Sequence, residues 1–457
     1  MSFRIWRLVA ICLVSLFIIL DINQVQAAGQ RRYNKSLHNK NHESTIRNTI
    51  LPKFKSNSNQ LIQGNHTSNV AVIVSSSRYW FNYRHVTNAL SIYHLLKRGG
   101  MTDDNIILML ADDIPCNMRN KYRGKIFPRG VDNIDLMEGV EIDYTGTDVT
   151  VDAFMRVLLG RHLPGEQTSS TNTRTTGGGK RSWPKIDQNT NVLVYLTGHG
   201  GDNFFKFQDG EELMSNDIAN AFSQMHEMKR YNEILFISDT CQAFTMADEI
   251  KVPNVFSVGS SLKNQNSYAS HSDIDVGQSV IDRYSKVIKD FVDDAVTLTS
   301  DSRSGENKLQ PIDETTVAVM ERINLHDMLV RIPMNHGDLG PNSKVGHTDY
   351  TCSRRMNKVP LSDFFAAPQT ARNSLMNKQA SIKSSLWMSE SLPSEAVNDD
   401  AGQSEQECKV DGETKRRPTN EKQKDKPKRE GMSSSDPLFL FFVVCFLLCI
   451  HLSSRVI

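Results

Sequence analysis

Two reactive side chains follow two apolar runs of strand length. His199 lies in Thr-Gly-His-Gly-Gly, directly after the apolar residues 192–196, and Cys241 lies in Ser-Asp-Thr-Cys-Gln, directly after the apolar residues 234–237. An imidazole can take the proton of a thiol and later return it to a leaving amine, while the thiolate attacks a carbonyl carbon. Glycine lets backbone approach a substrate closely, so the Gly200 amide can hydrogen-bond the oxyanion of the intermediate. The two motifs predict a dyad for acyl transfer.

Each residue alone has a simpler interpretation. A lone cysteine after a strand is usually a small buried hydrophobic residue, and a lone histidine beside glycine is usually a turn residue. The occurrence of Cys241 and His199 at successive strand ends favours the catalytic interpretation, with the simpler one as its alternative.

The hydrophobic pattern predicts the scaffold that positions the two motifs. Apolar runs alternate with segments of helical period, which is typical of a parallel sheet covered by helices, an α/β fold. The expected strands cover residues 70–74, 106–110, 192–196, 234–237 and 255–258, and the expected helices cover 84–98 and 217–228. Continuous apolar strands are buried on both sides, so helices are expected on both faces of the sheet. Active residues of such folds lie beyond the carboxyl ends of the strands.

Composition indicates one globular body with attachments. Of 457 residues, 39% are hydrophobic, and 53 basic residues nearly balance 52 acidic ones. This balance excludes recruitment of nucleic acid or of a membrane surface by overall charge alone, and no nucleic-acid partner is expected. One domain is expected at residues 66–365, with an inserted polar loop at 164–188, a flexible lead-in at 28–65 and a disordered linker at 366–436.

Both ends of the chain carry apolar segments. Residues 1–27 have the order of a secretory signal peptide, with an uncleaved signal anchor as the alternative. The stretch 437–452 carries no formal charge and is expected to be one C-terminal transmembrane helix. Basic residues before it oppose the positive-inside tendency, and nearby serines also resemble a glycolipid-attachment signal. Asn34 and Asn65 stand in acceptor triplets for N-glycans.

Several motifs in order resemble a known family. They are Tyr-Trp-Phe-Asn-Tyr-Arg-His at 79–85, Leu-Ala-Asp-Asp at 110–113, Tyr-Leu-Thr-Gly-His-Gly-Gly at 195–201, Arg-Tyr-Asn-Glu-Ile-Leu-Phe at 230–236 and Asp-Thr-Cys-Gln at 239–242. They are similar to the legumain-like cysteine peptidases, and most closely to the catalytic subunits of GPI-anchor transamidases. The resemblance implies a caspase-like fold with His199 and Cys241 as the dyad. It also implies that Asn82 orients His199 and that Ser260 and Ser261 line the substrate site.

The resemblance implies a disulfide to another subunit through Cys116. This cysteine occupies the place where the family's cysteine joins a partner, and a luminal protein can form such a bond. The alternatives are a free buried thiol and an internal bond to Cys352 or Cys408.

A structural calcium site is a further implication of the resemblance. Asp103, Glu141 and Asp143, with a backbone carbonyl near Ile106, would supply the oxygen ligands that this hard cation takes. Composition alone makes the same carboxylates solvated loop residues.

The activity that the resemblance implies is a transamidation without a catalytic cofactor. Cys241 would attack a precursor protein at its attachment residue, expel the C-terminal signal and leave a thioester, which the ethanolamine amine of a GPI lipid would then attack. The implied setting is a multisubunit complex in the endoplasmic reticulum membrane, with the catalytic domain in the lumen and multispan partner subunits. The alternatives are a legumain-like asparaginyl endopeptidase and an inactive scaffold of a membrane complex. Intact His199 and Cys241 argue against the scaffold.

Overall fold

The computed structural model describes residues 61–128, 134–161, 183, 186–299, 314–336 and 338–374 of the chain. All of them belong to one compact unit, Met1–Cys408. The predicted signal peptide, nearly all of the inserted loop and the predicted anchor at 437–452 lie outside these residues. Within the described ranges, no helix has the length and apolar character needed to cross a membrane.

A mostly parallel sheet forms the centre of the body, and its strands follow the order β10-β9-β8-β4-β1-β2-β3. Every neighbouring pair is parallel except β10 with β9. The strands are β1 (Ser68–Ser75), β2 (Ile106–Leu110), β3 (Tyr144–Thr145), β4 (Thr190–Thr197), β8 (Glu233–Asp239), β9 (Val255–Gly259) and β10 (Gly346–Thr348). The strands expected from the apolar runs are confirmed. The antiparallel edge strand β10 was not expected.

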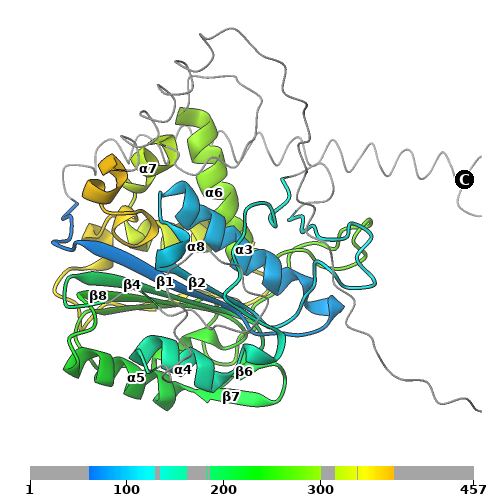
Figure 1. Cartoon of the computed structure of the whole chain (residues 1–457), viewed down its shortest axis with the longest axis horizontal. Helices are drawn as coiled ribbons and strands as arrows, with labels where there is room; N and C mark the ends of the chain where they lie inside the picture. Colours follow the sequence, from blue (N-terminus) through cyan, green and yellow to red (C-terminus); the bar gives the residue numbers. More distant parts are fainter. Residues whose placement is uncertain are drawn as a thin grey trace, which may run out of the picture. The chain divides into compact units, whose positions relative to one another are not determined.

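Helices cover both faces of this sheet, as the buried strands require (Figure 1). One face carries α3 (Tyr83–Arg98), α6 (Arg283–Thr299), α7 (Glu314–Met320), α8 (Ile332–His336) and α9 (Ser362–Phe365). The other face carries α4 (Val151–Leu159) and α5 (Ser215–Glu227). The arrangement fits the α/β, caspase-like expectation.

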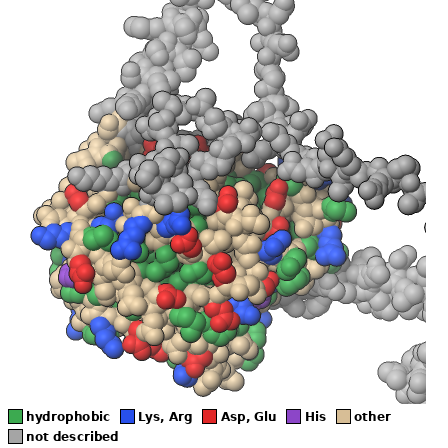
Figure 2. All heavy atoms as spheres, turned by 60° about the horizontal axis from the view of Figure 1, so that its bottom comes forward, with side chains coloured by type: hydrophobic (Ala, Val, Ile, Leu, Met, Phe, Trp, Pro, Cys, Tyr) green, Lys and Arg blue, Asp and Glu red, His purple; other side chains and the backbone are tan. Residues whose placement is uncertain are grey.

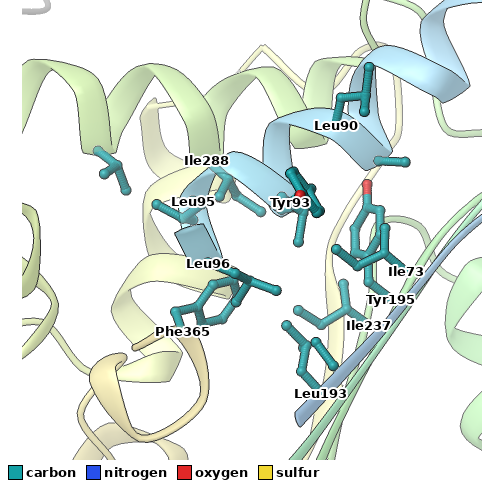
Figure 3. Close-up of a cluster of buried hydrophobic side chains, with 14 of the residues drawn as sticks. Ile73, Leu90, Tyr93, Leu95, Leu96, Leu193, Tyr195, Ile237, Ile288 and Phe365 are labelled. Carbon is teal, nitrogen blue, oxygen red and sulfur yellow. The ribbon is translucent and has the colours of Figure 1, made fainter. Parts of the chain in front are cut away.

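Successive side chains of each strand belong alternately to two hydrophobic clusters, one on each face of the sheet. Ile73 and Tyr195 point to the α3 face, whereas Val72 and Val194 point to the α5 face. Figure 3 shows α3 side chains such as Leu90 packed over the strands. Burying one large apolar side chain contributes about 1.5–3 kcal/mol, so the two clusters together fix the position of each strand.

A small antiparallel sheet follows β4 directly. It consists of β5 (Gly200–Gly201), β6 (Phe204–Phe207) and β7 (Glu211–Met214), so the segment expected to be a glycine-rich turn begins with a strand. Phe205 and Phe207 are fully buried, and this alternation attaches the small sheet to the α5 face. Figure 2 shows this side of the body, where acidic and basic side chains are interspersed with apolar ones.

The body extends beyond both predicted boundaries. Before residue 66, the Ile62 amide donates to the Lys358 carbonyl at 2.8 Å and the Gly64 amide donates to Asp363 at 2.9 Å. After residue 365, Ala366 and Ala367 are buried. Composition placed these polar segments outside the domain, but backbone pairing with partners distant in sequence keeps them inside it.

The end of α3 generates a prediction about stability. A Cβ atom at Gly99 would lie 2.0 Å from the Phe365 carbonyl oxygen, and the Ala367 amide donates to the Gly99 carbonyl at 2.9 Å. Gly99→Ala should therefore push this segment away and lower the free energy of unfolding by roughly 1–3 kcal/mol. Urea denaturation measures the change. Gly210→Ala is the control, because no atom lies within 4 Å of the added carbon; equal losses in both variants would contradict the prediction.

Candidate active site

Two adjacent parallel strands bring His199 and Cys241 to one edge of the sheet. β4 pairs with β8, and Thr197 lies opposite Asp239 at the carboxyl ends of the two strands. His199 stands two positions after Thr197, and Cys241 stands two positions after Asp239. The Gly198 amide also donates to the Asp239 carbonyl at 3.4 Å, which joins the two loops. The predicted neighbourhood of the two motifs is confirmed.

The residue after Cys241, Gln242, holds the loop that carries the cysteine in place. Gln242 adopts a left-handed conformation with φ 53°, which turns the chain sharply after the cysteine. Its amide donates to the Gln265 carbonyl at 2.9 Å, and its side chain accepts from the Asn264 amide at 2.9 Å. Cys241 itself is a half-buried free thiol, 3.9 Å from the Ser267 carbonyl oxygen.

The two serines predicted to line the substrate site lie under this loop. Both are buried, and the Ser261 and Ser260 hydroxyls donate to the Thr240 carbonyl at 2.8 and 3.3 Å. Ser261 also accepts from the Ala243 amide at 3.2 Å. Their contacts therefore fix the backbone on both sides of Cys241, while contact with substrate stays a prediction.

Asn82 holds the ring of His199. Its Oδ1 lies 2.9 Å from His199 Nε2, and its Nδ2 donates to the Arg78 carbonyl at 2.6 Å. Because that second bond requires the NH₂ group on the Arg78 side, the oxygen faces the histidine and Nε2–H is the donor. Nδ1 is then the basic nitrogen of a neutral His199. The predicted contact of Asn82 with His199 is confirmed, and its catalytic role stays a prediction.

The hairpin β5–β6 directs the Gly200 amide. The Lys206 amide donates to the His199 carbonyl at 2.9 Å, so Gly200 and its partner Phe205 form a non-hydrogen-bonded pair of the ladder. The Gly200 N–H therefore points away from β6. A Cβ atom at this position would lie 2.7 Å from Thr240 Oγ1, which explains the glycine beside the Cys241 loop. This geometry supports Gly200 as an oxyanion donor.

The site lies within a recognisable family match. Residues 69–307 match the Peptidase C13 family. The chain belongs to this family. Proteins named GPI-anchor transamidase are similar to it: 48% identity over 229 residues in Saccharomyces cerevisiae, covering 50% of this chain and 53% of the relative. The Homo sapiens protein of that name is 38% identical over 277 residues, covering 60% of this chain and 66% of the relative. The chain thus spans about half to two thirds of the length of these relatives.

In this C13 peptidase domain, burial favours the neutral forms of both His199 and Cys241. Burial, followed by the positive charge of Arg84, lowers the pKa of His199. Burial raises the pKa of the Cys241 thiol, the Ser267 carbonyl contact opposes this, and the negative charges of Asp282 and Asp239 raise it further. A neutral thiol and a neutral imidazole on loops that follow neighbouring strands suit proton transfer during attack rather than a preformed ion pair.

Two buried acids beneath the dyad were missed by sequence reasoning. Asp282 accepts from Arg84 Nε at 3.1 Å and Asn88 Nδ2 at 2.5 Å, and Asp239 accepts from the Ser285 hydroxyl at 2.6 Å. Burial raises the pKa of Asp239 above its ordinary value, and burial together with the negative charge of Asp239 raises the pKa of Asp282 to about 7. Asp239 stands in the Cys241 motif and could have been singled out there. Asp282 follows no strand and carried no local signal.

The predicted calcium ligands lie around Tyr93. Asp103 accepts from the Tyr93 hydroxyl and from Lys97 Nζ, the latter at 2.6 Å, and Asp143 accepts from the Leu108 amide at 2.8 Å. Across the described parts of the chain, no three His, Cys, Asp or Glu side chains are grouped as metal ligands. Lys97 Nζ bonds Asp103 in this structure, and a calcium site formed by Asp103, Glu141, Asp143 and the carbonyl near Ile106 stays a prediction. No chemical step depends on the ion.

The remaining predicted sites are placed as follows. Cys116 is disulfide-bonded, and the other cysteines of the described ranges, Cys241 and Cys352, are free, so a bond between Cys116 and Cys352 is excluded. Because only this chain is present, the bond that Cys116 makes here is internal, in line with the alternative of an internal bond. The disulfide to another subunit stays an untested implication of the family resemblance. Asn65 is exposed, as a glycan acceptor must be, and Asn34 lies outside the described residues.

The uncharged dyad predicts how the thiol reacts with pH. Iodoacetamide alkylates only the thiolate. Because burial raises the pKa of Cys241, the pH profile of its alkylation rate should have a midpoint above the ordinary thiol pKa. Peptide mapping by mass spectrometry separates Cys241 from the other cysteines. Cys352, whose pKa burial raises to about 12, is the internal control and should react more slowly. A rate at Cys241 that is constant from acid to neutral pH would indicate an ion pair instead.

The buried acids predict a pH dependence of stability. A carboxyl whose pKa is raised on folding stabilises the protein fully below its unfolded pKa, and this contribution is lost as pH rises through the folded pKa. For Asp282 the window runs from 3.8 to about 7. The melting temperature of Asp282→Asn minus that of the wild type should therefore increase from pH 4 to pH 7. Calorimetry over this range measures the difference, and a difference independent of pH would contradict the raised pKa.

Proposed function

We propose that this chain is the catalytic subunit of a GPI-anchor transamidase. The observation that carries the proposal is the position of His199, held by Asn82 at 2.9 Å, at the strand end next to that of Cys241. A thiol, an imidazole and an amide that orients the imidazole are the groups that acyl transfer through a thioester requires. The names of the relatives, GPI-anchor transamidase, indicate the acyl acceptor.

In the first half-reaction, Nδ1 of His199 takes the proton of Cys241 as the sulfur attacks the carbonyl carbon of the attachment residue. The Gly200 amide donates to the oxyanion of the tetrahedral intermediate. The C–N bond then breaks, and the proton held by His199 passes to the leaving nitrogen of the C-terminal signal. A thioester on Cys241 remains, and the histidine is neutral again.

In the second half-reaction, the ethanolamine amine of a GPI lipid attacks the thioester. His199 accepts a proton from the attacking nitrogen, the C–S bond breaks, and the thiolate recovers that proton. The product is an amide, and the dyad returns to its starting state. Water could follow the same route, so the preference for an amine must come from outside the dyad.

The setting of the enzyme belongs to the same proposal. The catalytic domain lies in the lumen of the endoplasmic reticulum, and residues 437–452 anchor it in the membrane. Both substrates are amphiphilic, since one has an apolar protein tail and the other has lipid chains. A single short anchor cannot shelter both, so the chain works in a complex with multispan subunits that bind the tail and the lipid.

A trapped thioester tests this function. Incubation of the complex with a precursor protein should yield a precursor fragment bound through Cys241 and released by hydroxylamine. Cys241→Ala and His199→Ala should abolish the adduct and the processing, because the two residues act as one unit. Asn82→Ala should slow processing by less than the roughly 10²–10⁴-fold of full general acid–base catalysis, because it orients the ring without exchanging protons.

Cys352→Ser is the matched control for these variants, since Cys352 is a free thiol distant from the dyad in sequence. Cells that depend on it should display GPI-anchored proteins normally, whereas cells with Cys241→Ala should accumulate uncleaved precursors. Normal display with Cys241→Ala would refute the assignment. Hydrolysis after asparagine without transfer to an amine would identify an endopeptidase.

A further inference from the structure

Lys206 stands beside His199 across the hairpin β5–β6. Gly200 pairs with Phe205 in this antiparallel ladder, so His199, the residue before Gly200, lies opposite Lys206, the residue after Phe205. The Lys206 amide donates to the His199 carbonyl at 2.9 Å, which agrees with this register. Side chains directly opposite in an antiparallel pair project from the same face, with Cβ atoms about 4.5–5.5 Å apart. Lys206 is therefore the cross-strand neighbour of the imidazole.

Two buried phenylalanines fix the direction in which Lys206 points. Phe205 and Phe207 are fully buried in the cluster on the α5 face. Because successive side chains of a strand point to opposite sides, Lys206 between them projects away from that cluster. It is half-buried there. The ammonium thus lies on the side of the hairpin that carries the His199 ring.

The ammonium of Lys206 has no ion-pair partner in the part of the chain that the structure describes. Glu212 lies opposite Lys206 on β7, and Asp209 lies in the turn after β6; both are exposed. Burial and the charge of Arg84 lower the pKa of His199 most, Asp209 opposes this change, and the charge of Lys206 adds to it. The charge of Lys206 therefore reaches the imidazole, and its ammonium is available to an anionic group of a substrate.

Two arginines on the α3 side of His199 differ from Lys206 in their contacts. Arg84 Nε bonds Asp282 at 3.1 Å, so its charge is paired. The Arg78 guanidinium lies 5.6 Å from the centre of the Tyr79 ring. Among the described residues, neither a carboxylate nor a ring contacts the Lys206 ammonium in this way. Of these three cations, Lys206 is the one open to a ligand.

The position of β5 determines which part of a substrate reaches Lys206. A Cβ atom at Gly200 would lie 2.7 Å from Thr240 Oγ1, so the Cys241 loop borders one side of β5, and β6 with Lys206 borders the other. The acyl group is bonded to the sulfur and occupies the Cys241 side. The nitrogen that leaves and the nitrogen that attacks both exchange a proton with His199. The rest of each nitrogen-bearing molecule therefore extends past His199 toward Lys206.

The two nitrogen-bearing molecules differ in charge at this place. The departing signal begins with small residues followed by a polar spacer, which need not carry an anion. In the GPI acceptor, two carbons join the amine to a phosphodiester. Neighbouring strands lie about 4.7–4.9 Å apart, so an amine at His199 places the phosphate over the next strand, where Lys206 stands. Asp209 and Glu212 oppose a lone anion, whereas this acceptor brings an ammonium together with its phosphate.

We propose that Lys206 binds the phosphate of the ethanolamine phosphate group that carries the attacking amine. This assignment rests on the proposed function and supplies a preference for the amine over water, which the dyad itself does not provide. The contact between ammonium and phosphate holds the amine beside the thioester, and this raises its effective concentration. Lys206 takes no proton from the acceptor.

Two small acceptors, offered to the intact complex with a precursor protein, test this proposal. 2-Aminoethyl methyl phosphate carries the phosphodiester, whereas 2-methoxyethylamine has no charge beyond its amine, and mass spectrometry measures both products. The wild type should prefer the phosphodiester in kcat/KM. Lys206→Gln should lower this preference about tenfold, the loss of one hydrogen bond to a charged group. A change in the basicity of His199 affects both acceptors alike and cancels in the ratio.

Three further variants are informative. Lys206→Arg keeps the charge and should keep the preference for the phosphodiester. Glu212→Gln removes the carboxylate opposite Lys206 and should increase the preference, which tests the proposal even if Lys206→Gln does not fold. Lys229→Gln is the matched control, since Lys229 is exposed and precedes β8 at the opposite edge of the sheet. Its preference should be that of the wild type.

An unchanged preference in Lys206→Gln, or in Glu212→Gln if the first variant does not fold, would overturn the proposal. An equal loss with both acceptors would also overturn it and would make Lys206 a residue that tunes His199. Inorganic phosphate should inhibit the wild type only weakly, because Asp209 and Glu212 oppose a free anion. Strong inhibition that Lys206→Gln abolishes would assign the site to free phosphate instead.

Failure of the proposed function has a different signature. A wild-type complex that releases the tail by hydrolysis and transfers the precursor to neither amine would refute the transamidase assignment. Transfer to both amines without a preference would leave that assignment intact and refute only the role of Lys206.

Discussion

The pairing of β4 with β8 is the constraint on which the site depends. Thr197 lies opposite Asp239, so the residues two positions further on, His199 and Cys241, start from equivalent places at the same edge. Both strands are buried on both faces, and a slip of one residue would turn each apolar side chain to the wrong cluster. The hydrophobic core thus sets the catalytic register. The same packing that stabilises the fold determines whether the two loops meet.

Buried polar contacts then fix each loop separately. Ser260 and Ser261 bind the carbonyl before Cys241, and Gln242 binds the segment after β9. On the other side, Asn82 binds both Arg78 and His199. Each reactive side chain is therefore positioned by its own neighbours before any substrate arrives. Such positioning lowers the cost of reaching the transition state, because little reorganisation remains to be done.

The electrostatic environment keeps this positioned pair unreactive at rest. Buried Asp239 and Asp282 oppose a negative charge on Cys241, and Arg84 opposes a positive charge on His199. Formation of a thiolate–imidazolium ion pair is therefore disfavoured in the free enzyme. A neutral resting thiol reduces the side reactions that a free thiolate would undergo.

Local patterns in the sequence determined the strands, the main crossover helices and the two reactive residues. Apolar runs report burial on both faces directly, and a cysteine and a histidine at strand ends have few other uses together. The resemblance to a family added Asn82, and the contact with His199 confirms its place. Only the tertiary structure decided the features that depend on contacts between distant segments. The antiparallel β10, the position of Asp282 beneath the dyad and the inclusion of residues 61–65 all follow from such contacts. No local periodicity encodes them, because their stability comes from partners far away in the sequence, and sequence spacing alone does not reveal which partners meet.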